Sequence, residues 1–107
     1  MAATPLVVLT TVGSVEDART LVRALVRERV IACGTILPAG TSIYRWNNEL
    51  KEEQEVLVVM KTEGSRWDAL QTAVRARHPY LIPELLALPV DRGLEAYLSW
   101  LEREVIV

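Results

Sequence analysis

The sequence has a single cysteine, Cys33, among its 107 residues. A lone cysteine cannot form a disulfide within the chain, and this fits a reducing compartment. The N-terminal segment lacks a basic region and its apolar run covers only residues 6–9, so it does not resemble a secretory signal peptide. No stretch approaches the ~20 apolar residues that span a bilayer. We therefore expect a cytoplasmic protein with no membrane partner.

The chain also lacks a strong excess of charge. It has 12 basic and 14 acidic residues, which gives a formal net charge of -2 at pH 7. Broad nucleic-acid binding depends on basic surfaces that neutralise phosphates, so we expect no nucleic-acid partner. Half of the residues are hydrophobic, which excludes intrinsic disorder. The length is typical of one domain, and we expect a single domain over residues 1–107.

Features of enzymes are scarce. The chain has one histidine, His78, which limits general acid–base schemes. It has neither a glycine-rich phosphate loop nor a G-x-S-x-G segment. Cys33 and His78 would in principle make a nucleophile pair, but nothing in the sequence orients them toward each other. We therefore expect a protein that is not an enzyme.

Hydrophobic periodicity predicts the order of strands and helices. The predicted strands cover residues 5–11, 30–37, 42–46, 49–62 and 81–90, and the predicted helices cover residues 14–29, 65–78 and 94–101. Residues 105–107 are a candidate short terminal strand. The two middle segments, 30–46 and 49–62, form a long hairpin. The result is an α+β fold of the ferredoxin-like, split βαβ type with an added C-terminal helix and short strand.

Local signals set the predicted ends of these elements. Ser14 is placed to cap the first helix, and Ser65 the second. The second helix must end near His78, because a proline follows and disfavours helical geometry in the residue before it. Asn47 and Asn48 tolerate positive φ and predict the hairpin turn. We interpret the charged run at residues 49–55 as a solvated hairpin end.

Many short segments, taken in order, resemble the CutA divalent-cation-tolerance family. They are AC at 32–33, LP at 37–38, TSIYRW at 41–46, EVL at 55–57, MKT at 60–62, HPY at 78–80, PE at 83–84, ALPV at 87–90, G at 93 and YLSW at 97–100. The resemblance implies a ferredoxin-like fold and a homotrimer in which strands of neighbouring subunits pair. It also implies a link to copper and other divalent metals. The chain departs from the family pattern at Gly34 and Thr35, at the hairpin tip, and at Leu81.

By the same resemblance Cys33, His78 and Glu84 are candidate metal ligands. A thiolate suits Cu(I), and an imidazole and a carboxylate would complete a mixed Cu(I) or Cu(II) site. Each residue also has an ordinary structural interpretation. Cys33 fits a small buried residue in a strand, and His78 fits a helix end bonded to carbonyl groups. Glu84 fits a solvated charge or a partner of Lys61.

A cleft is a second candidate site. Tyr44, Trp46, Tyr80 and Trp100, together with Lys61, are the residues we expect to line a cleft or an interface. Aromatic side chains at such spacing more often belong to a core or an interface than to a ligand site. Trp46, near the exposed hairpin, is well suited to anchor a neighbouring subunit.

Three functions remain open at this point. The first is a small cytoplasmic homotrimer that confers divalent-cation tolerance by binding copper or a similar metal ion. The second is a trimeric signalling or adaptor protein, similar to the nitrogen-regulatory PII type, which binds a small anionic ligand or a protein partner at the cleft between subunits. Lys61 would then meet the anion. The third is a purely structural trimer that presents surfaces to a partner.

Overall fold

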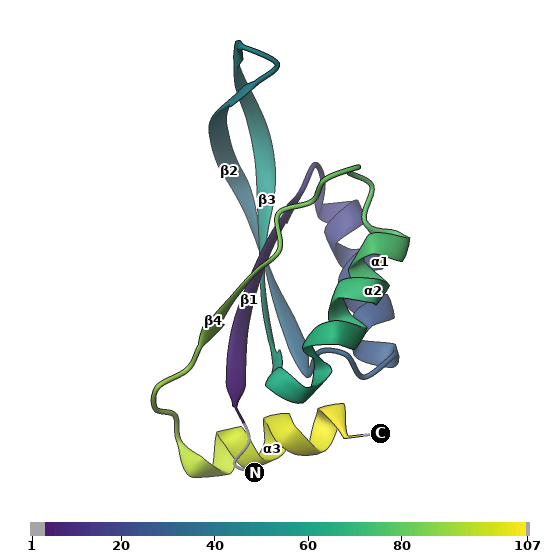
Figure 1. The fold of residues 1–107 in the computed structure, drawn as a ribbon, viewed down its shortest axis with the longest axis vertical. Coiled ribbons are helices and arrows are strands. Elements are labelled where there is room, and N and C mark those ends of the chain that lie inside the picture. Colours follow the sequence, from purple (N-terminus) through teal and green to yellow (C-terminus); the bar gives the residue numbers. More distant parts are fainter. Residues whose placement is uncertain (1–3, 107) are drawn as a thin grey trace.

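The computed structural model describes residues 4–106, which form one sheet covered by helices on one face (Figure 1). The elements are β1 (Pro5–Val12), α1 (Val15–Arg27), β2 (Cys33–Trp46), β3 (Glu49–Glu63), the short 3₁₀ turn η1 (Gly64–Arg66), α2 (Trp67–Arg77), β4 (Leu86–Pro89) and α3 (Glu95–Val105). The sheet order is β2-β3-β1-β4 and every neighbouring pair is antiparallel. This is the predicted split βαβ arrangement.

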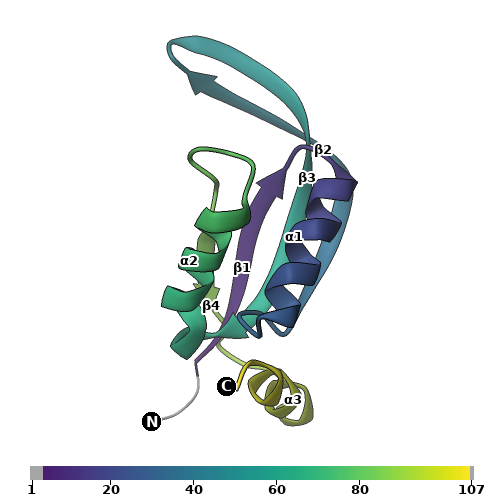
Figure 2. The same ribbon diagram turned by 90° about the vertical axis from the view of Figure 1, so that its right-hand side faces the viewer.

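The hydrophobic core lies between the sheet and the helices α1 and α2. Alternate residues of β1 are buried, and Val8 and Val12 are inaccessible to solvent. Leu25 of α1 and Leu70 of α2 meet them from the helices. Figure 2 shows both helices on the same face of the sheet, with α3 crossing at one end. None of these helices, within the part of the chain that is described, is long and apolar enough to cross a membrane.

The opposite face of the sheet is largely uncovered. Because side chains alternate along a strand, the residues between the core positions point to this second face. We call its apolar part the open sheet face; it consists of Val7, Leu9, Leu37, Leu57, Val59, Leu86 and Leu88. Leu86 is 57% exposed and Leu88 is 48% exposed. A single subunit therefore presents a row of aliphatic side chains to its surroundings.

The outer part of the hairpin extends beyond the rest of the sheet (Figure 1). β1 ends at Val12 opposite Val56, so the residues of β3 before Val56 pair with β2 alone. Asn47 and Asn48 have φ of 51° and 64°, the left-handed values that a two-residue hairpin turn requires, and the predicted turn is confirmed. The strands predicted separately at 30–37 and 42–46 belong to one strand, β2, with a register shift between Leu37 and Gly40 and with Ala39 at φ 68°.

Two predicted strands are shorter in the structure. Residues 30–32 do not join the sheet as a strand, because Val30 still donates its amide to Leu25 of α1 and closes that helix. In the segment 81–90, only Leu86–Pro89 pairs with β1. The preceding residues turn outward, and Leu81 is 96% exposed. Pro83 cannot donate to a ladder, which accounts for the irregular path.

Two predicted ends were also wrong. Ser65 does not cap α2, because it lies inside the 3₁₀ turn that precedes the helix, and the N-cap residue is Arg66. Ser14 does cap α1, since its side chain accepts from the amide of Asp17. The predicted terminal strand at residues 105–107 is also wrong, because Val105 is the last residue of α3. Val105 is buried on the same helix face as Leu101. Val107 lies outside the described residues.

Candidate functional site

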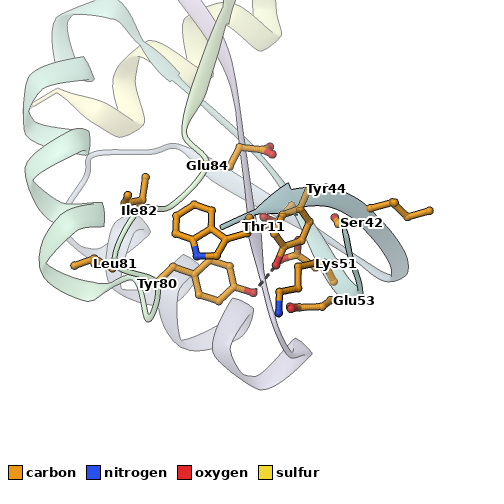
Figure 3. Close-up of a pocket in the computed structure, with 12 residues that line it drawn as sticks. Thr11, Ser42, Tyr44, Lys51, Glu53, Tyr80, Leu81, Ile82 and Glu84 are labelled. Carbon is orange, nitrogen blue, oxygen red and sulfur yellow. Dashed lines mark hydrogen bonds between the residues drawn. The ribbon is translucent and has the colours of Figure 1, made fainter. Parts of the chain in front are cut away.

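A groove lies between the protruding hairpin and the loop that follows α2 (Figure 3). Its volume is about 790 Å³. We call it the hairpin groove and define it by the six side chains that give it its character: Tyr44, Trp46, Glu53, Glu55, Tyr80 and Glu84. The groove forms because the β2–β3 hairpin extends beyond the end of β1. The outer parts of β2 and β3 therefore face the loop that follows α2.

Three aromatic rings line the hairpin groove. Tyr44 and Trp46 are two residues apart on β2, so they point to the same side of the hairpin. Tyr80 reaches in from the loop after α2 (Figure 3). Trp46 is 49% exposed although it is a large apolar residue. Such accessible aromatic surface is available to a ligand or to another protein chain.

Carboxylates face the same groove. Glu53 and Glu55 are also two residues apart, on β3, and Glu84 comes from the loop. The hydroxyl of Tyr80 donates to Oε2 of Glu55 over 2.9 Å. Burial, this hydrogen bond and the negative charge nearby raise the pKa of Tyr80 to about 12. The pKa of Tyr44 is raised as well, by loss of contact with water and then by Glu53.

His78 packs against Tyr80, and both of its ring nitrogens form hydrogen bonds. Nε2 is 2.8 Å from the carbonyl oxygen of Thr11, and the amide of Tyr80 donates to Nδ1 over 3.1 Å. Since a carbonyl only accepts, Nε2 carries the proton and Nδ1 is the acceptor. Burial lowers the pKa of His78, with the Thr11 carbonyl opposing the shift. In this arrangement neither nitrogen has a free lone pair for a metal ion.

Cys33 sits at the other end of the sheet, beside α3. It pairs with Lys61 across the β2–β3 ladder, and its Sγ is 3.7 Å from the hydroxyl of Tyr97. The ammonium of Lys61 is 5.9 Å from the centre of the Tyr97 ring. Trp100 packs against Tyr97 with ring centres 5.6 Å apart. These four side chains form a second cluster, which we call the α3 cluster.

The sequence-predicted residues therefore fall into two places. Tyr44, Trp46, Tyr80 and Glu84 line the hairpin groove, with His78 packed against Tyr80. Cys33, Lys61 and Trp100 belong to the α3 cluster instead. Within one subunit Lys61 lies over Tyr97 and forms no ion pair with Glu84 among the described residues. Within residues 4–106 of one subunit, no three histidine, cysteine, aspartate or glutamate side chains come together to hold a metal ion.

Sequence reasoning missed Glu53 and Glu55 as groove residues. They were part of the charged run attributed to a solvated hairpin end. The hairpin register provides the missing signal, because Ser42 pairs with Glu53 and Tyr44 pairs with Lys51. Directly opposed residues share a face of the sheet, so the glutamates at 53 and 55 belong on the side of Tyr44. Pro83 predicts that the segment 80–84 is irregular, but no pattern in the sequence predicts the side of the sheet to which this loop turns.

Comparison with known proteins places this fold among named relatives. Residues 6–104 match the family profile described as "CutA1 divalent ion tolerance protein". A "Divalent-cation tolerance protein CutA" from Thermus thermophilus is 50% identical over 95 residues, which cover 89% of this chain and 92% of the relative. A protein of the same name from Escherichia coli O45:K1 is 42% identical over 98 residues, covering 92% of this chain and 88% of the relative.

Solved structures agree with this result. The divalent cation tolerance protein from Thermus thermophilus superposes with a TM-score of 0.91 at 48% identity, covering 94% of this chain and 97% of the other. The structure of CutA1 from Oryza sativa gives a TM-score of 0.93 at 35% identity, covering 96% and 94%. The shared fold thus extends over almost the whole chain.

Proposed function

The chain belongs to the CutA1 divalent ion tolerance protein family, and from this premise we propose that it acts in divalent-cation tolerance as a homotrimer that binds copper or a similar ion. The tolerance function comes with the family. The copper ion, the trimer and the ligating residues are our proposal, and each is supported by a separate feature of the subunit.

The open sheet face supports self-association. Leu86 and Leu88 on β4 and Val59 on β3 belong to an apolar surface on the side of the sheet opposite α1 and α2, and α3 packs against this side at the end formed by Cys33 and Lys61. Exposed apolar surface of this kind marks protein–protein contacts. β2 and β4 are also edge strands with free pairing groups along one side. A symmetric assembly of identical subunits would cover both features at once.

Cys33 is the residue on which the copper proposal rests. A thiolate is a soft ligand and favours Cu(I). Its strand register places Cys33 on the same side of the sheet as the open sheet face, so assembly brings it near a neighbouring subunit. Since a single subunit gathers no three ligands within the described residues, the other ligands would come from neighbouring copies. Glu84 and His78 remain predicted ligands, and His78 would first have to release Thr11 or the amide of Tyr80.

The signalling alternative is less well supported. A small anion would have to enter a groove that carries Glu53, Glu55 and Glu84. Lys61, the cation expected to meet it, lies at the α3 cluster instead. We also propose that the protein is not an enzyme and that it works in the cytoplasm, where a lone thiol such as Cys33 stays reduced. A solved relative from Archaeoglobus fulgidus is described as periplasmic, so fractionation of the native host is the test of location.

Native mass spectrometry tests the proposal directly. The purified protein is measured before and after anaerobic Cu(I) and after aerobic Cu(II). We expect a trimer that takes up copper, and we expect Cys33→Ser to lose the Cu(I) while remaining a trimer. Thr35→Val, two residues along the same strand, is the matched control and should keep the copper. A monomer would contradict the assembly, and a copper-free trimer would contradict the metal site.

A further inference from the structure

We propose that Glu63 forms a proton-dependent switch for α3. With a neutral carboxyl group at this residue, α3 stays packed against the end of the sheet. With an ionised one, a minor state becomes more populated in which α3 has moved away and Cys33 is accessible. The junction lies within one subunit, so the switch does not require an open sheet face. The effect on copper binding rests on the proposed function, whereas the motion of α3 does not.

A small apolar cluster holds α3. The helix lies across one end of the sheet (Figure 1), where Leu101 and Val105 pack with Ala32. This cluster is separate from the main core between the sheet and the helices α1 and α2. Arg29 adds a hydrogen bond from Nη1 to the carbonyl oxygen of Glu104 over 3.2 Å. Elements with few buried contacts open at a lower free energy than the whole protein, so α3 is an element that a local charge can move.

Glu63 lies at the junction of α3 with the sheet. It ends β3 two residues after Lys61, so both side chains point to the side of the sheet on which α3 packs. The side chain of Glu63 is 3% exposed, and its Oε2 has no hydrogen-bond partner among residues 4–106. Burial and then the charge of Glu102 on α3 raise its pKa, and a hydrogen bond from the amide of Thr4 opposes the shift. Thr4 directly precedes β1, so this bond ties Glu63 to the sheet and leaves α3 as the part that moves.

The positive groups at the junction are engaged elsewhere. The charged residues on the elements that meet here are Arg29, Lys61, Arg66, Glu102, Arg103 and Glu104. Arg29 and Arg66 donate to backbone carbonyl groups, and Lys61 lies over the ring of Tyr97. The three charged residues on α3 are exposed. Among the described residues no lysine or arginine forms an ion pair with Glu63, so its carboxylate meets a like charge on α3 without a positive partner.

Ionisation of Glu63 therefore favours the open state. A buried carboxylate without a partner is unfavourable, and moving α3 away lets water reach it and separates it from Glu102. Because the pKa of Glu63 lies above the ordinary 4.5 in the closed form, that form binds the proton more tightly than the open form does. The closed state is fully favoured below pH 4.5. The open fraction grows as the pH rises through the pKa of the closed form, by at most about tenfold per pH unit.

Opening makes the thiol of Cys33 accessible. Its Sγ is 3.7 Å from the hydroxyl of Tyr97, which belongs to α3. Cys33 itself belongs to β2 and pairs with Lys61 in the sheet. Movement of α3 thus takes Tyr97 away and leaves Cys33 in place. Access of a thiol reagent, and of Cu(I), to Cys33 should increase as Glu63 ionises.

Hydrogen exchange of the intact protein, measured by mass spectrometry, tests the motion of α3. The rates are divided by the intrinsic amide rate at each pH. At pH 7 we expect peptides from residues 95–105 to exchange at least about tenfold faster than peptides from residues 67–77 of α2. The corrected rates of α3 should rise between pH 4.5 and pH 7. Glu63→Gln keeps the shape of the side chain but cannot ionise, so it should remove this rise and slow α3 about fivefold at pH 7.

Labelling of Cys33 with N-ethylmaleimide tests the second half of the switch. Cys33 is the only cysteine, so the labelled site is unambiguous. At pH 7 we expect Glu63→Gln to slow labelling about fivefold, in step with the slower exchange of α3. Labelling of the native protein should hardly change in dilute urea, because release of one helix exposes little surface compared with global unfolding. Glu104→Gln removes an equal charge from an exposed position of α3 and should change both rates less than twofold.

Three outcomes would overturn the switch. Equal exchange rates in α3 and α2 of the native protein would mean that α3 opens only with the whole protein. Equal effects of Glu104→Gln and Glu63→Gln would mean that net charge, and not the buried carboxyl group, controls the rates. Unchanged labelling of Cys33 in Glu63→Gln would mean that α3 does not control access to the thiol. A native protein that takes up no copper would contradict the proposed function and would leave all of these rates unaffected.

Discussion

The imidazole of His78 donates from Nε2 to the carbonyl oxygen of Thr11 over 2.8 Å, and this contact ties the end of α2 to the end of β1. The other ring nitrogen accepts from the amide of Tyr80, so the same side chain also fixes the start of the loop that borders the hairpin groove. His78 is 8% exposed. A residue predicted as a metal ligand therefore has a structural role within the subunit.

This arrangement predicts a neutral His78 at pH 7. Burial lowers its pKa below the usual 6.5, so the unfolded chain takes up a proton at a higher pH than the folded one. The associated stability is present above pH 6.5 and is lost as the pH falls through the pKa of the folded protein. Because His78 is the only histidine, its ¹⁵N resonances are unambiguous in a long-range NMR titration. We expect the Nε2–H tautomer throughout the neutral range.

His78→Gln serves as the companion variant. An amide can still donate to Thr11 but does not titrate. The fall in unfolding free energy below pH 6.5 that His78 causes should therefore disappear in urea titrations, which leaves the opposite pH dependence of Glu63. A pKa above 6.5 in the native protein, or an Nδ1–H tautomer, would contradict the hydrogen-bond assignment. The Nδ1–H tautomer would also leave the lone pair of Nε2 available to the predicted metal ion.

Glu63 gives a second prediction, of opposite sign. Its side chain is buried at 3% exposure, and Oε2 has no hydrogen-bond partner within the described part of the chain. Burial and then the charge of Glu102 raise its pKa, while the amide of Thr4 lowers it. The folded state thus favours the protonated form, whose stability is present below pH 4.5 and lost as the pH rises through the folded pKa. At pH 7 the carboxylate destabilises the protein.

Glu63→Gln should therefore stabilise the protein by about 1 kcal/mol at pH 7, and by much less at pH 4. Urea unfolding at both values measures the difference. Glu104→Gln, which removes an equal charge from an exposed position of α3, is the control and should change stability by less than about 0.5 kcal/mol. Equal effects of the two substitutions would attribute the gain to net charge instead of to the buried carboxyl group.

Much of the fold follows from local chemistry in the sequence. The cap at Ser14, the turn at Asn47 and Asn48 and the end of α2 at His78 each depend on neighbouring residues, and each is confirmed. The predictions failed where the fold depends on more distant packing. Burial beside Leu101 keeps Val105 in a helix. Pro83 and the outward turn of the loop limit β4 to four residues.

The candidate site divides in the same way. Tyr44, Trp46 and Tyr80 were predicted to line a cleft or an interface and Glu84 to bind a metal ion, and all four side chains lie around one groove. The relation between Cys33 and His78 could not be predicted, because no short spacing links them. They lie toward opposite ends of the sheet, since Cys33 pairs with Lys61 and His78 bonds to Thr11, which pairs with Leu57. Distances of this kind follow from sheet register, which a single sequence does not state.

The register shift between Leu37 and Gly40 in the hairpin leads to a third prediction. Ala39 has φ of 68°, which costs an L-residue roughly 1–2 kcal/mol and costs glycine little. Glycine also makes the unfolded chain more flexible, so Ala39→Gly should gain about 0.5 kcal/mol net. Ala73→Gly, in the interior of α2, is the same substitution in a helix and should lose about 1 kcal/mol. A loss in Ala39→Gly would mean that the shift in register is not strained.

The neighbouring glycine predicts the reverse effect. A Cβ at Gly40 would lie 2.8 Å from the carbonyl oxygen of Glu55, which is too close unless the backbone moves. Gly40→Ala should therefore destabilise the hairpin and displace Glu55 from the groove. Thermal unfolding measures the first effect, and a change in the pH titration of Tyr80, whose hydroxyl donates to Glu55, measures the second. Full stability in Gly40→Ala would show that the two strands can separate there without cost.

The last prediction concerns the open sheet face. Val59 lies near its centre, and its side chain is only half-buried in the subunit, so a lysine there can extend into solvent without disturbing the core. In an assembly that covers this face, the same ammonium group would be buried without a partner, at a cost of several kcal/mol. Val59→Lys should therefore be a folded monomer by light scattering, with an unchanged far-UV circular dichroism spectrum. Val26→Lys adds the same charge on α1, in the helical layer on the other side of the sheet, and should remain a trimer. A trimer in both variants would show that the subunits associate through another surface, such as the hairpin, and would place Cys33 away from the contact between subunits.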